Sequence, residues 1–418
     1  MSTANTETTA QPPQAADFSL LQLLDPRVLA NPYPLYKAMR ENEPVHWDPY
    51  AHMWIVTSYA EVVTVLSHFN AQRTPTPESL AARGLAVMEP FAQMMVKQML
   101  FMDGAAHARL RSLCSSAFAP RRVAALKSSI EEIVRGLLDR VIESGSMDVV
   151  ADLASPFPAM VAAALLGFPM EDHRQLKEWS TDFAELLGNF QHNPDRVKQV
   201  LRSLSELKAY VYEKLEEQRR SPRDGLLHAL IVAEVDGVKL TDEEVVANTI
   251  VTLTGGQETT TNLIANGLLA LIRHPEQLAR LRAQPETLET AIEELVRYDP
   301  PIQHTARIAP EDMELGGKTI KKGSAVTSVL AAANRDPARF PNPDRLDLMR
   351  QDNRHLSFGW AAHYCFGAPL ARMESHLAFK ALLTRLDDIQ VATPTLTWRS
   401  NTGLRGLSSL PITFISRN

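Results

Sequence analysis

The sequence predicts a mainly α-helical fold with small β-sheets, on three observations. Apolar residues recur at helical spacing in several segments between Ser58 and Met313. Strand-like segments are short and lie on either side of this helical region. The chain has 418 residues, of which 45% are hydrophobic and 22% charged, which is enough for a large core. We expect residues 1–17 to be a disordered tail rich in Thr, Ala, Gln and Pro, and residues 18–418 to form a single domain.

The individual elements follow from apolar periodicity and from the positions of proline and glycine. The helices expected from this pattern are Pro34–Arg40, Val123–Val141, Val197–Leu215, Leu288–Val296 and Leu370–Leu386. The extended segments expected are Val45–Val56, Lys318–Ile320 and Ser324–Leu330.

One predicted helix is unusually long. Thr241 and Glu244 have the spacing of a capping box, and no proline follows until Pro275. More than thirty residues can therefore be helical, over a length of about 50 Å. Gly255 and Gly256 interrupt it, at a cost of roughly 1 kcal/mol each relative to alanine. Such a conflict is typical of functional sites, although the glycines could instead let another helix pack closely.

Composition excludes several classes of protein. Lys and Arg number 43 against 49 Asp and Glu, so the net charge of −6 does not favour binding to nucleic acid or to a membrane surface. Two cysteines cannot form a disulfide framework or a four-thiolate metal site. No apolar run approaches the roughly eighteen residues of a membrane span, and the N-terminus lacks the pattern of a signal peptide. We expect a cytoplasmic protein.

The segment Phe358–Gly367 carries the most specific chemistry. Cys365 lies between glycines just before a predicted helix, where backbone N–H groups and the helix dipole favour a thiolate. The alternative is a buried structural cysteine. Zinc is not favoured, because only His363 is close and Cys114 is the sole other thiol.

Two charged pairs have helical spacing. Glu294 and Arg297 lie three residues apart, and Arg345 is a candidate third member of that group. His107 and Arg111 lie four residues apart on one helix face, where they could hold an anion. Taken singly, each pair is more often a solvated helix surface than a functional site.

Together, the order and spacing of these motifs resemble the cytochrome P450 family of the soluble bacterial type, from about Asp25 onward. The matching segments are His107…Arg111, Gly255-Gly256-Gln257-Glu258-Thr259, Glu294…Arg297, Ala333–Pro337, Phe358-Gly359…His363…Cys365…Gly367 and Arg405–Leu407. The resemblance implies the cytochrome P450 fold, a triangular prism of helices with the long central helix over a haem.

The resemblance also implies haem b (iron protoporphyrin IX) as the cofactor, with Cys365 as the thiolate axial ligand of the haem iron. The residues matching family positions that neutralise the haem propionates are His107, Arg111, Arg307 and His363. A structural ion network behind the cysteine loop is implied for Glu294, Arg297 and Arg345. Two departures from the family pattern are Ala361, where a glycine is usual, and Leu346, where an aromatic is commoner.

Glu258 and Thr259 match the family's acid–alcohol pair, which relays protons during oxygen activation. Gly255 and Gly256 would let the helix open over the haem and admit O₂. The implied activity is a monooxygenase reaction that uses two electrons from a separate redox partner and inserts one oxygen atom, as in hydroxylation. The alternatives are epoxidation, desaturation or phenol coupling on the same cofactor, or a haem protein that binds a ligand without turnover.

By family position, the substrate pocket is expected at Val251, Gly255, Ile302, Gln303 and Leu404. Methionines 88, 94, 95, 99 and 102 would form either an adaptable lid or ordinary packing. The expected substrate is a mid-sized apolar molecule of secondary, lipid or terpenoid metabolism. The expected electron donors are a ferredoxin with ferredoxin reductase, or a flavodoxin, docking on a monomer. The basic residues proposed for that docking are Arg109, Arg121, Arg122 and Arg354.

Overall fold

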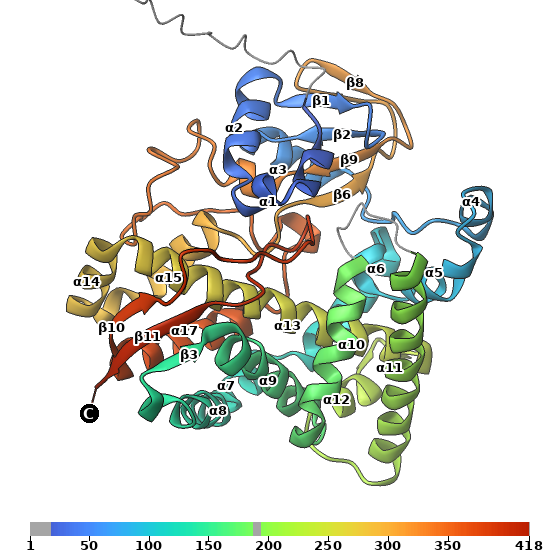
Figure 1. Ribbon diagram of the computed structural model, residues 1–418. Coiled ribbons are helices and arrows are strands. Elements are labelled where there is room, and N and C mark those ends of the chain that lie inside the picture. Colours follow the sequence, from blue (N-terminus) through green and yellow to red (C-terminus); the bar gives the residue numbers. More distant parts are fainter. Residues whose placement is uncertain (1–17, 187–193, 418) are drawn as a thin grey trace, which may run out of the picture.

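The structure is a computed structural model that describes residues 18–186 and 194–417. A β-sheet with small helices occupies one end of the molecule, and longer helices surround the central helix α13 in the rest (Figure 1). The predicted mainly helical fold with small sheets is confirmed. The tail predicted for residues 1–17 lies outside the described residues.

Four short strands distant in sequence form the larger sheet, in the order β1-β2-β9-β6. The strands are β1 (Val45–Asp48), β2 (Met53–Val56), β6 (Thr305–Ile308) and β9 (Ala325–Ser328). β1 and β2 form an antiparallel hairpin, whereas β2 and β9 are parallel, with Trp54 opposite Val326. Val45 and Val326 share one buried apolar cluster. This pairing anchors the N-terminal part of the chain beside the residues that lead to the cysteine loop.

Small helices cover this sheet, and further strands form three smaller sheets. The helices are α1 (Pro26–Ala30), α2 (Tyr33–Asn42), α3 (Tyr59–His68) and α16 (Leu330–Ala333). The remaining strands are β3 (Ser146–Asp148), β4 (Glu234–Val235), β5 (Val238–Lys239), β7 (Met313–Leu315), β8 (Lys318–Ile320), β10 (Leu386–Val391) and β11 (Pro411–Ser416). Their pairings are β10-β11-β3, β4-β5 and β7-β8.

The long predicted helix is α13, which spans Asp242–Arg273 and begins with the expected capping box of Thr241 and Glu244. It is continuous through Gly255 and Gly256, so the expected opening of the helix at these glycines is wrong for this structure. Close packing does not explain the two glycines either, because an added Cβ at either position would meet no atom within 4 Å. They leave one side of α13 open in the middle of the molecule.

The other helices surround α13 (Figure 1). They are α4 (Pro77–Ala82), α5 (Glu89–Met95), α6 (Gly104–Ala117), α7 (Pro120–Ala125), α8 (Lys127–Asp139), α9 (Pro156–Leu166), α10 (His173–Leu186), α11 (Pro194–Arg220), α12 (Leu226–Val232), α14 (Pro275–Ala283), α15 (Leu288–Tyr298) and α17 (Ala368–Arg385). The helix expected at Val123–Val141 is divided into α7 and α8 at Leu126. Helices α9, α10, α11, α15 and α17 all pack against α13.

One segment, Val149–Leu166, is long and apolar enough to cross a membrane by length and composition. It comprises α9 and the turn of π-helix before it, and 67% of it is buried inside the protein. Burial of this kind is typical of a core helix. The segment was missed in the sequence because Asp152, Ser155 and Pro156 interrupt its apolar run.

Candidate active site

The cysteine loop connects a short 3₁₀ turn, Ala361–His363, to the start of α17. The backbone N–H of Cys365 donates to the carbonyl of Phe358 at 2.8 Å, which closes the loop. Desolvation by the surrounding loop raises the pKa of the Cys365 thiol, although the residue is exposed to solvent, and N–H groups of Gly367 and Ala368 and the charge of Arg111 oppose the shift. The loop thus contains the N–H groups predicted to favour a thiolate.

Backbone strain marks the same loop. Gly359 has a φ of +74°, and a Cβ there would come within 3.2 Å of the His363 carbonyl oxygen. Ala361 has a φ of +53°, in the left-handed region that favours glycine. The methyl group at the position where the family usually has glycine is therefore accommodated, at a cost in conformational energy.

Two stacked imidazoles lie beside the loop. The rings of His107 on α6 and His363 have their centroids 4.2 Å apart. Nε2 of His363 lies 3.4 Å from Oδ1 of Asp103, whose carboxylate also accepts the backbone N–H groups of Ala71 and Gln72. Burial, together with the neighbouring His107 and Arg307, lowers the pKa of His363 to about 4. Both imidazoles are therefore neutral near pH 7 in this structure, because burial also lowers the pKa of His107.

Two guanidinium groups complete this cluster. Burial lowers the pKa of Arg307 to about 10 and that of Arg73 to about 9, and the charge of Arg307 contributes to the shift at Arg73. The buried atoms Nε of Arg307 and Nε2 of His107 have no hydrogen-bond partner among the described residues. Asp103 is the nearby carboxylate, and it carries one negative charge. The cluster therefore has unused donors and excess positive charge, which fit a group bearing two carboxylates.

Arg111 lies on the same face of α6 as His107, as its spacing predicted. Its Nη2 donates to the carbonyl of Tyr364 at 2.6 Å, and its guanidinium carbon lies 5.5 Å from the Phe366 ring centroid. Arg111 thus supports the residues on both sides of Cys365. Arg73 was missed in the sequence, because no local motif marks it.

Glu258 and Thr259, the acid–alcohol pair, point in different directions. The Thr259 hydroxyl donates to the carbonyl of Gly255 at 2.6 Å, next to the open side of α13. Glu258 is only 3% exposed and accepts a hydrogen bond from Thr181 at 2.7 Å. It forms ion pairs with Lys177 on α10 and with Arg399 in the C-terminal segment.

These two cations hold Glu258 in its charged form. Although burial opposes ionisation, Lys177 and Arg399 together hold the pKa of Glu258 at about 2. Lys177 also lines a surface cleft of about 400 Å³, so the buried carboxylate has a connection toward solvent. The sequence motif predicted Glu258 but neither partner, since both come from distant elements.

The predicted ion network behind the cysteine loop is present, but one of its three predicted residues is replaced by another arginine. Glu294 and Arg297 are fully buried and joined by two hydrogen bonds of 2.7 and 2.8 Å. The prediction for Arg345 is wrong. Arg345 is exposed, and only its backbone carbonyl contacts Arg297, at 3.3 Å. Arg350 supplies the second cation instead, with Nε 3.1 Å from Glu294. Arg350 lies five residues further along the same irregular segment, and no sequence pattern marks it as the member of the network.

Comparison with known proteins identifies the family. The model of the cytochrome P450 family matches residues 49–391, well over half of the chain. The chain is a cytochrome P450. Its cofactor is accordingly haem b, and its class of activity is that of the P450 monooxygenases.

Two curated relatives come from Bacillus subtilis (strain 168). The chain is 37% identical to the biotin biosynthesis cytochrome P450 over 389 residues, which cover 92% of this chain and 97% of that protein. It is also 37% identical to the polyketide biosynthesis cytochrome P450 PksS over 393 residues, which cover 91% and 95%. A crystal structure of P450BioI in complex with an acyl carrier protein ligated with hexadec-9Z-enoic acid has a TM-score of 0.87 and 36% identity, with 93% and 99% coverage.

The expected substrate residues of the P450 fall into two groups. Val251 and Gly255 lie on α13, while Ile302 and Leu404 form an isolated antiparallel bridge. The Gln303 side chain is 2% exposed, and its Nε2 donates to the Pro300 carbonyl at 2.7 Å. Its buried Oε1 has no hydrogen-bond partner among the described residues.

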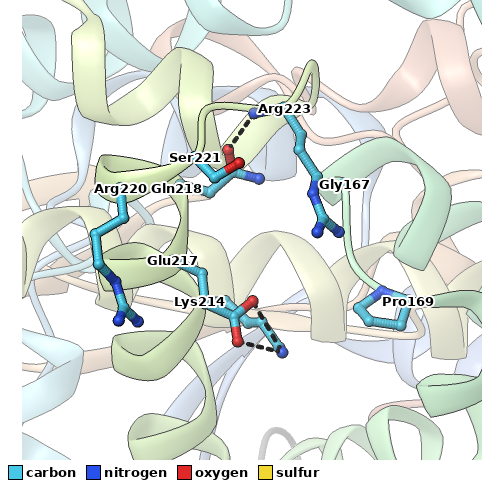
Figure 2. Close-up of a pocket in the computed structure, with 8 residues that line it drawn as sticks. All are labelled: Gly167, Pro169, Lys214, Glu217, Gln218, Arg220, Ser221 and Arg223. Carbon is cyan, nitrogen blue, oxygen red and sulfur yellow. Dashed lines mark hydrogen bonds and ion pairs between the residues drawn. The ribbon is translucent and has the colours of Figure 1, made fainter.

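The methionine cluster belongs mostly to the core of the P450. Met94, Met95 and Met99 are each less than 9% exposed and lie in the main apolar cluster, with Met88 and Met102 packed against it. This burial favours ordinary packing over an exposed lid. A separate cleft of about 320 Å³ on α11 contains the ion pair of Lys214 and Glu217 and none of the candidate site residues (Figure 2).

The basic residues predicted for redox-partner docking are only partly available. Arg109 forms an ion pair with Glu244, and Arg122 donates to the Ala117 carbonyl and lies 3.6 Å from Asp224. Arg121 is exposed on α7, and the exposed Arg354 has its Nε 4.0 Å from Oδ1 of Asp352. The four arginines therefore do not form one uniform cationic patch in this structure.

Proposed function

We propose that this P450 hydroxylates a mid-sized apolar molecule, and that the Cys365 thiolate would hold the haem iron. Bound haem b supplies the iron centre that activates dioxygen and carries out the oxidation. The observation that carries the proposal is the arrangement of the Cys365 loop beside a cluster rich in cationic and donor groups, together with the acid–alcohol pair on α13. His107, Arg111, Arg307 and His363 would hold the haem propionates.

Each residue around the cysteine has a separate task in this proposal. The N–H groups of Gly367 and Ala368 and the charge of Arg111 stabilise a thiolate at Cys365 once it is a metal ligand. Glu294, Arg297 and Arg350 hold the segment that leads into the loop, and so fix the position of the sulfur. These residues position the site and do not take part in bond making.

Glu258 and Thr259 would relay protons to the reacting oxygen. With a pKa of about 2, Glu258 is a carboxylate near pH 7, so it acts first as a proton acceptor. Lys177 contacts both this carboxylate and the surface cleft, and is therefore the group through which protons reach Glu258 from solvent. The Thr259 hydroxyl, now bonded to Gly255, rotates to pass the proton into the substrate side of α13.

The substrate is an acyl or polyketide chain in this proposal. Its support is the apolar composition of Val251, Ile302 and Leu404, and the biosynthetic roles for which the two curated relatives are named. Electrons would come from a ferredoxin with its reductase, or from a flavodoxin, which docks near Arg121 on a cytoplasmic monomer.

Substitution of Thr259 by alanine tests the function and the relay together. Hexadec-9-enoic acid is the first probe, with NADPH, a surrogate ferredoxin and its reductase. We expect the wild type to form a hydroxylated product, and Thr259→Ala to keep consuming NADPH while the ratio of peroxide to product rises about tenfold or more. Thr252→Ala is the control, because the Thr252 hydroxyl makes the same type of bond, to Asn248, two turns earlier.

The outcomes separate the alternatives. Full coupling in Thr259→Ala would contradict the proton relay. A spin-state change on ligand binding without any product, across fatty acids, steroids and macrolactones, would instead indicate a haem protein that binds ligands without turnover. Product analysis distinguishes hydroxylation from epoxidation, desaturation and phenol coupling.

A further inference from the structure

Arg73 lies in the segment between α3 and α4, at the edge of the cationic cluster. Its Nη1 donates to the carbonyl of Ala71 at 2.8 Å, and its guanidinium carbon lies 4.6 Å from the centroid of the Phe101 ring. These contacts fix the plane of the guanidinium group, and most of its five N–H donors have no partner among residues 18–186 and 194–417. No family motif quoted above includes this residue.

The charges around Arg73 do not balance. Among the described residues, neither Arg73 nor Arg307 forms a salt bridge with a carboxylate. The carboxylate that interacts electrostatically with both arginines is Asp103. It already accepts hydrogen bonds from two backbone N–H groups and lies beside His363. Arg307 uses Nη1 for the Thr305 hydroxyl and the Ala306 carbonyl, and its Nε has no partner in the described part of the chain. The buried guanidinium group of Arg307 and the half-buried one of Arg73 repel each other unless an anion lies between them.

We propose that Arg73 binds a haem propionate together with Arg307. This inference rests on the proposed function, in which haem b occupies the site beside Cys365. A propionate offers the planar carboxylate that a guanidinium group binds with two parallel hydrogen bonds. Arg73 and Arg307 would share one carboxylate, leaving His107, His363 and Arg111 near the other. The carboxylate group of an acidic substrate could bind the same two arginines. The experiment below distinguishes substrate binding from propionate binding.

The test compares holoenzymes carrying Arg73→Gln and Arg73→Lys, with Arg83→Gln as a control at an exposed arginine after α4. The first measurement is the rate of haem transfer to excess apomyoglobin. We expect Arg73→Gln to lose haem about tenfold faster, equivalent to about 1.4 kcal/mol. Arg73→Lys should restore part of the loss, and Arg83→Gln should match the wild type.

The second measurement is the reduction potential of the haem, which a purely structural role would not move. Removing a cation from the propionates favours the ferric state, so the potential of Arg73→Gln should become more negative, with Arg73→Lys close to the wild type. Unchanged haem transfer and potential in Arg73→Gln would overturn the proposal. It would also be overturned if Arg73→Gln weakened binding of hexadec-9-enoic acid but not of its methyl ester, with haem transfer unchanged.

These results are distinguishable from failure of the proposed function. If the wild type binds no haem, or binds it without a thiolate ligand, the function itself is wrong. If the wild type has the thiolate-ligated haem and Arg73→Gln retains it equally well, only the role of Arg73 is wrong.

Discussion

Buried ionisable residues in this P450 differ in whether ion pairs and hydrogen bonds offset the cost of burying their charge. Glu258 is fully compensated, because Lys177 and Arg399 neutralise it and Thr181 donates a hydrogen bond. A carboxylate held in this way exchanges protons only when one of its ion pairs opens. Proton delivery should therefore depend on movement of α10 or of the C-terminal segment relative to α13.

His304 is a buried imidazole whose titration is measurable. Burial lowers its pKa from 6.5 to about 4, although a hydrogen bond with the Thr402 backbone opposes the shift. The unfolded chain therefore binds a proton at higher pH than the folded one. The stabilising effect of a neutral His304 is complete above pH 6.5 and is lost progressively as the pH falls toward 4.

We expect the free energy of unfolding of the wild type to fall between pH 6.5 and 4, with His304 contributing at most about 1.4 kcal/mol per pH unit. His304→Gln cannot titrate, so its curve should be flatter by that contribution. Urea unfolding at several pH values measures both slopes. Identical slopes in the two proteins would show that His304 does not carry this pH dependence.

The site residues that the sequence revealed are those with local motifs. Cys365, His363, His107 and Glu258 stand at fixed short distances from glycines or from other polar residues. The residues that it did not reveal act across large separations in the chain: Lys177 and Arg399 are 81 and 141 residues from Glu258. No periodicity links such pairs, because the fold alone brings them together.

At the scale of elements, the cysteine loop combines a rigid anchor with a strained turn. The anchor is the hydrogen bond from Cys365 to Phe358, and the strain lies at Ala361, whose φ is +53°. A residue with a Cβ costs about 1 kcal/mol in this conformation relative to glycine. The loop keeps its shape because α17 and the ion network hold both of its sides.

Ala361→Gly should therefore raise the free energy of unfolding by about 1 kcal/mol, less the entropy that glycine gains in the unfolded state. Gly359→Ala is the opposite case, since its Cβ would lie in the left-handed region near the His363 carbonyl, and should destabilise the protein. Chemical denaturation of the two variants beside the wild type measures both effects. Destabilisation by Ala361→Gly would contradict the assigned strain.

The ion network offers a second comparison between two nearby arginines. Arg350→Ala removes a cation from the fully buried Glu294 and should lower the free energy of unfolding by about 2 kcal/mol. Arg345→Ala leaves the backbone carbonyl in place and should change it by less than about 0.5 kcal/mol. Equal effects of the two substitutions on the urea midpoint would mean that Arg350 is not the network member.

Elements with strong local signals agreed with the sequence. The capping box at Thr241 placed the start of α13, and the proline after His274 placed its end. The division of α7 from α8 at Leu126 carried no signal, since neither glycine nor proline marks it. The continuity of α13 through Gly255 and Gly256 agrees with the predicted length of more than thirty residues, because packing of the whole helix outweighs the low helix propensity of two residues.

In the molecule as a whole, the four-stranded sheet at one end is built from segments far apart in the sequence. Helix α13 runs through the rest and carries the acid–alcohol pair. The parallel pairing of β2 with β9 joins residues about 270 positions apart, as Trp54 and Val326 illustrate. Alternation of apolar residues identified both strands but could not identify their partners. The family resemblance implied small sheets and a long central helix but no strand pairing, so the parallel pairing of β2 with β9 comes from the structure.

The site is built around Cys365 as the thiolate ligand of a catalytic haem. The carbon monoxide difference spectrum of the reduced, purified protein is the sharpest test of that role. We predict the red-shifted Soret band of a thiolate-ligated haem, lost in Cys365→Ala while Cys114→Ala retains it. A histidine-like spectrum in the wild type, or a thiolate spectrum that survives in Cys365→Ala, would contradict the assignment of the site.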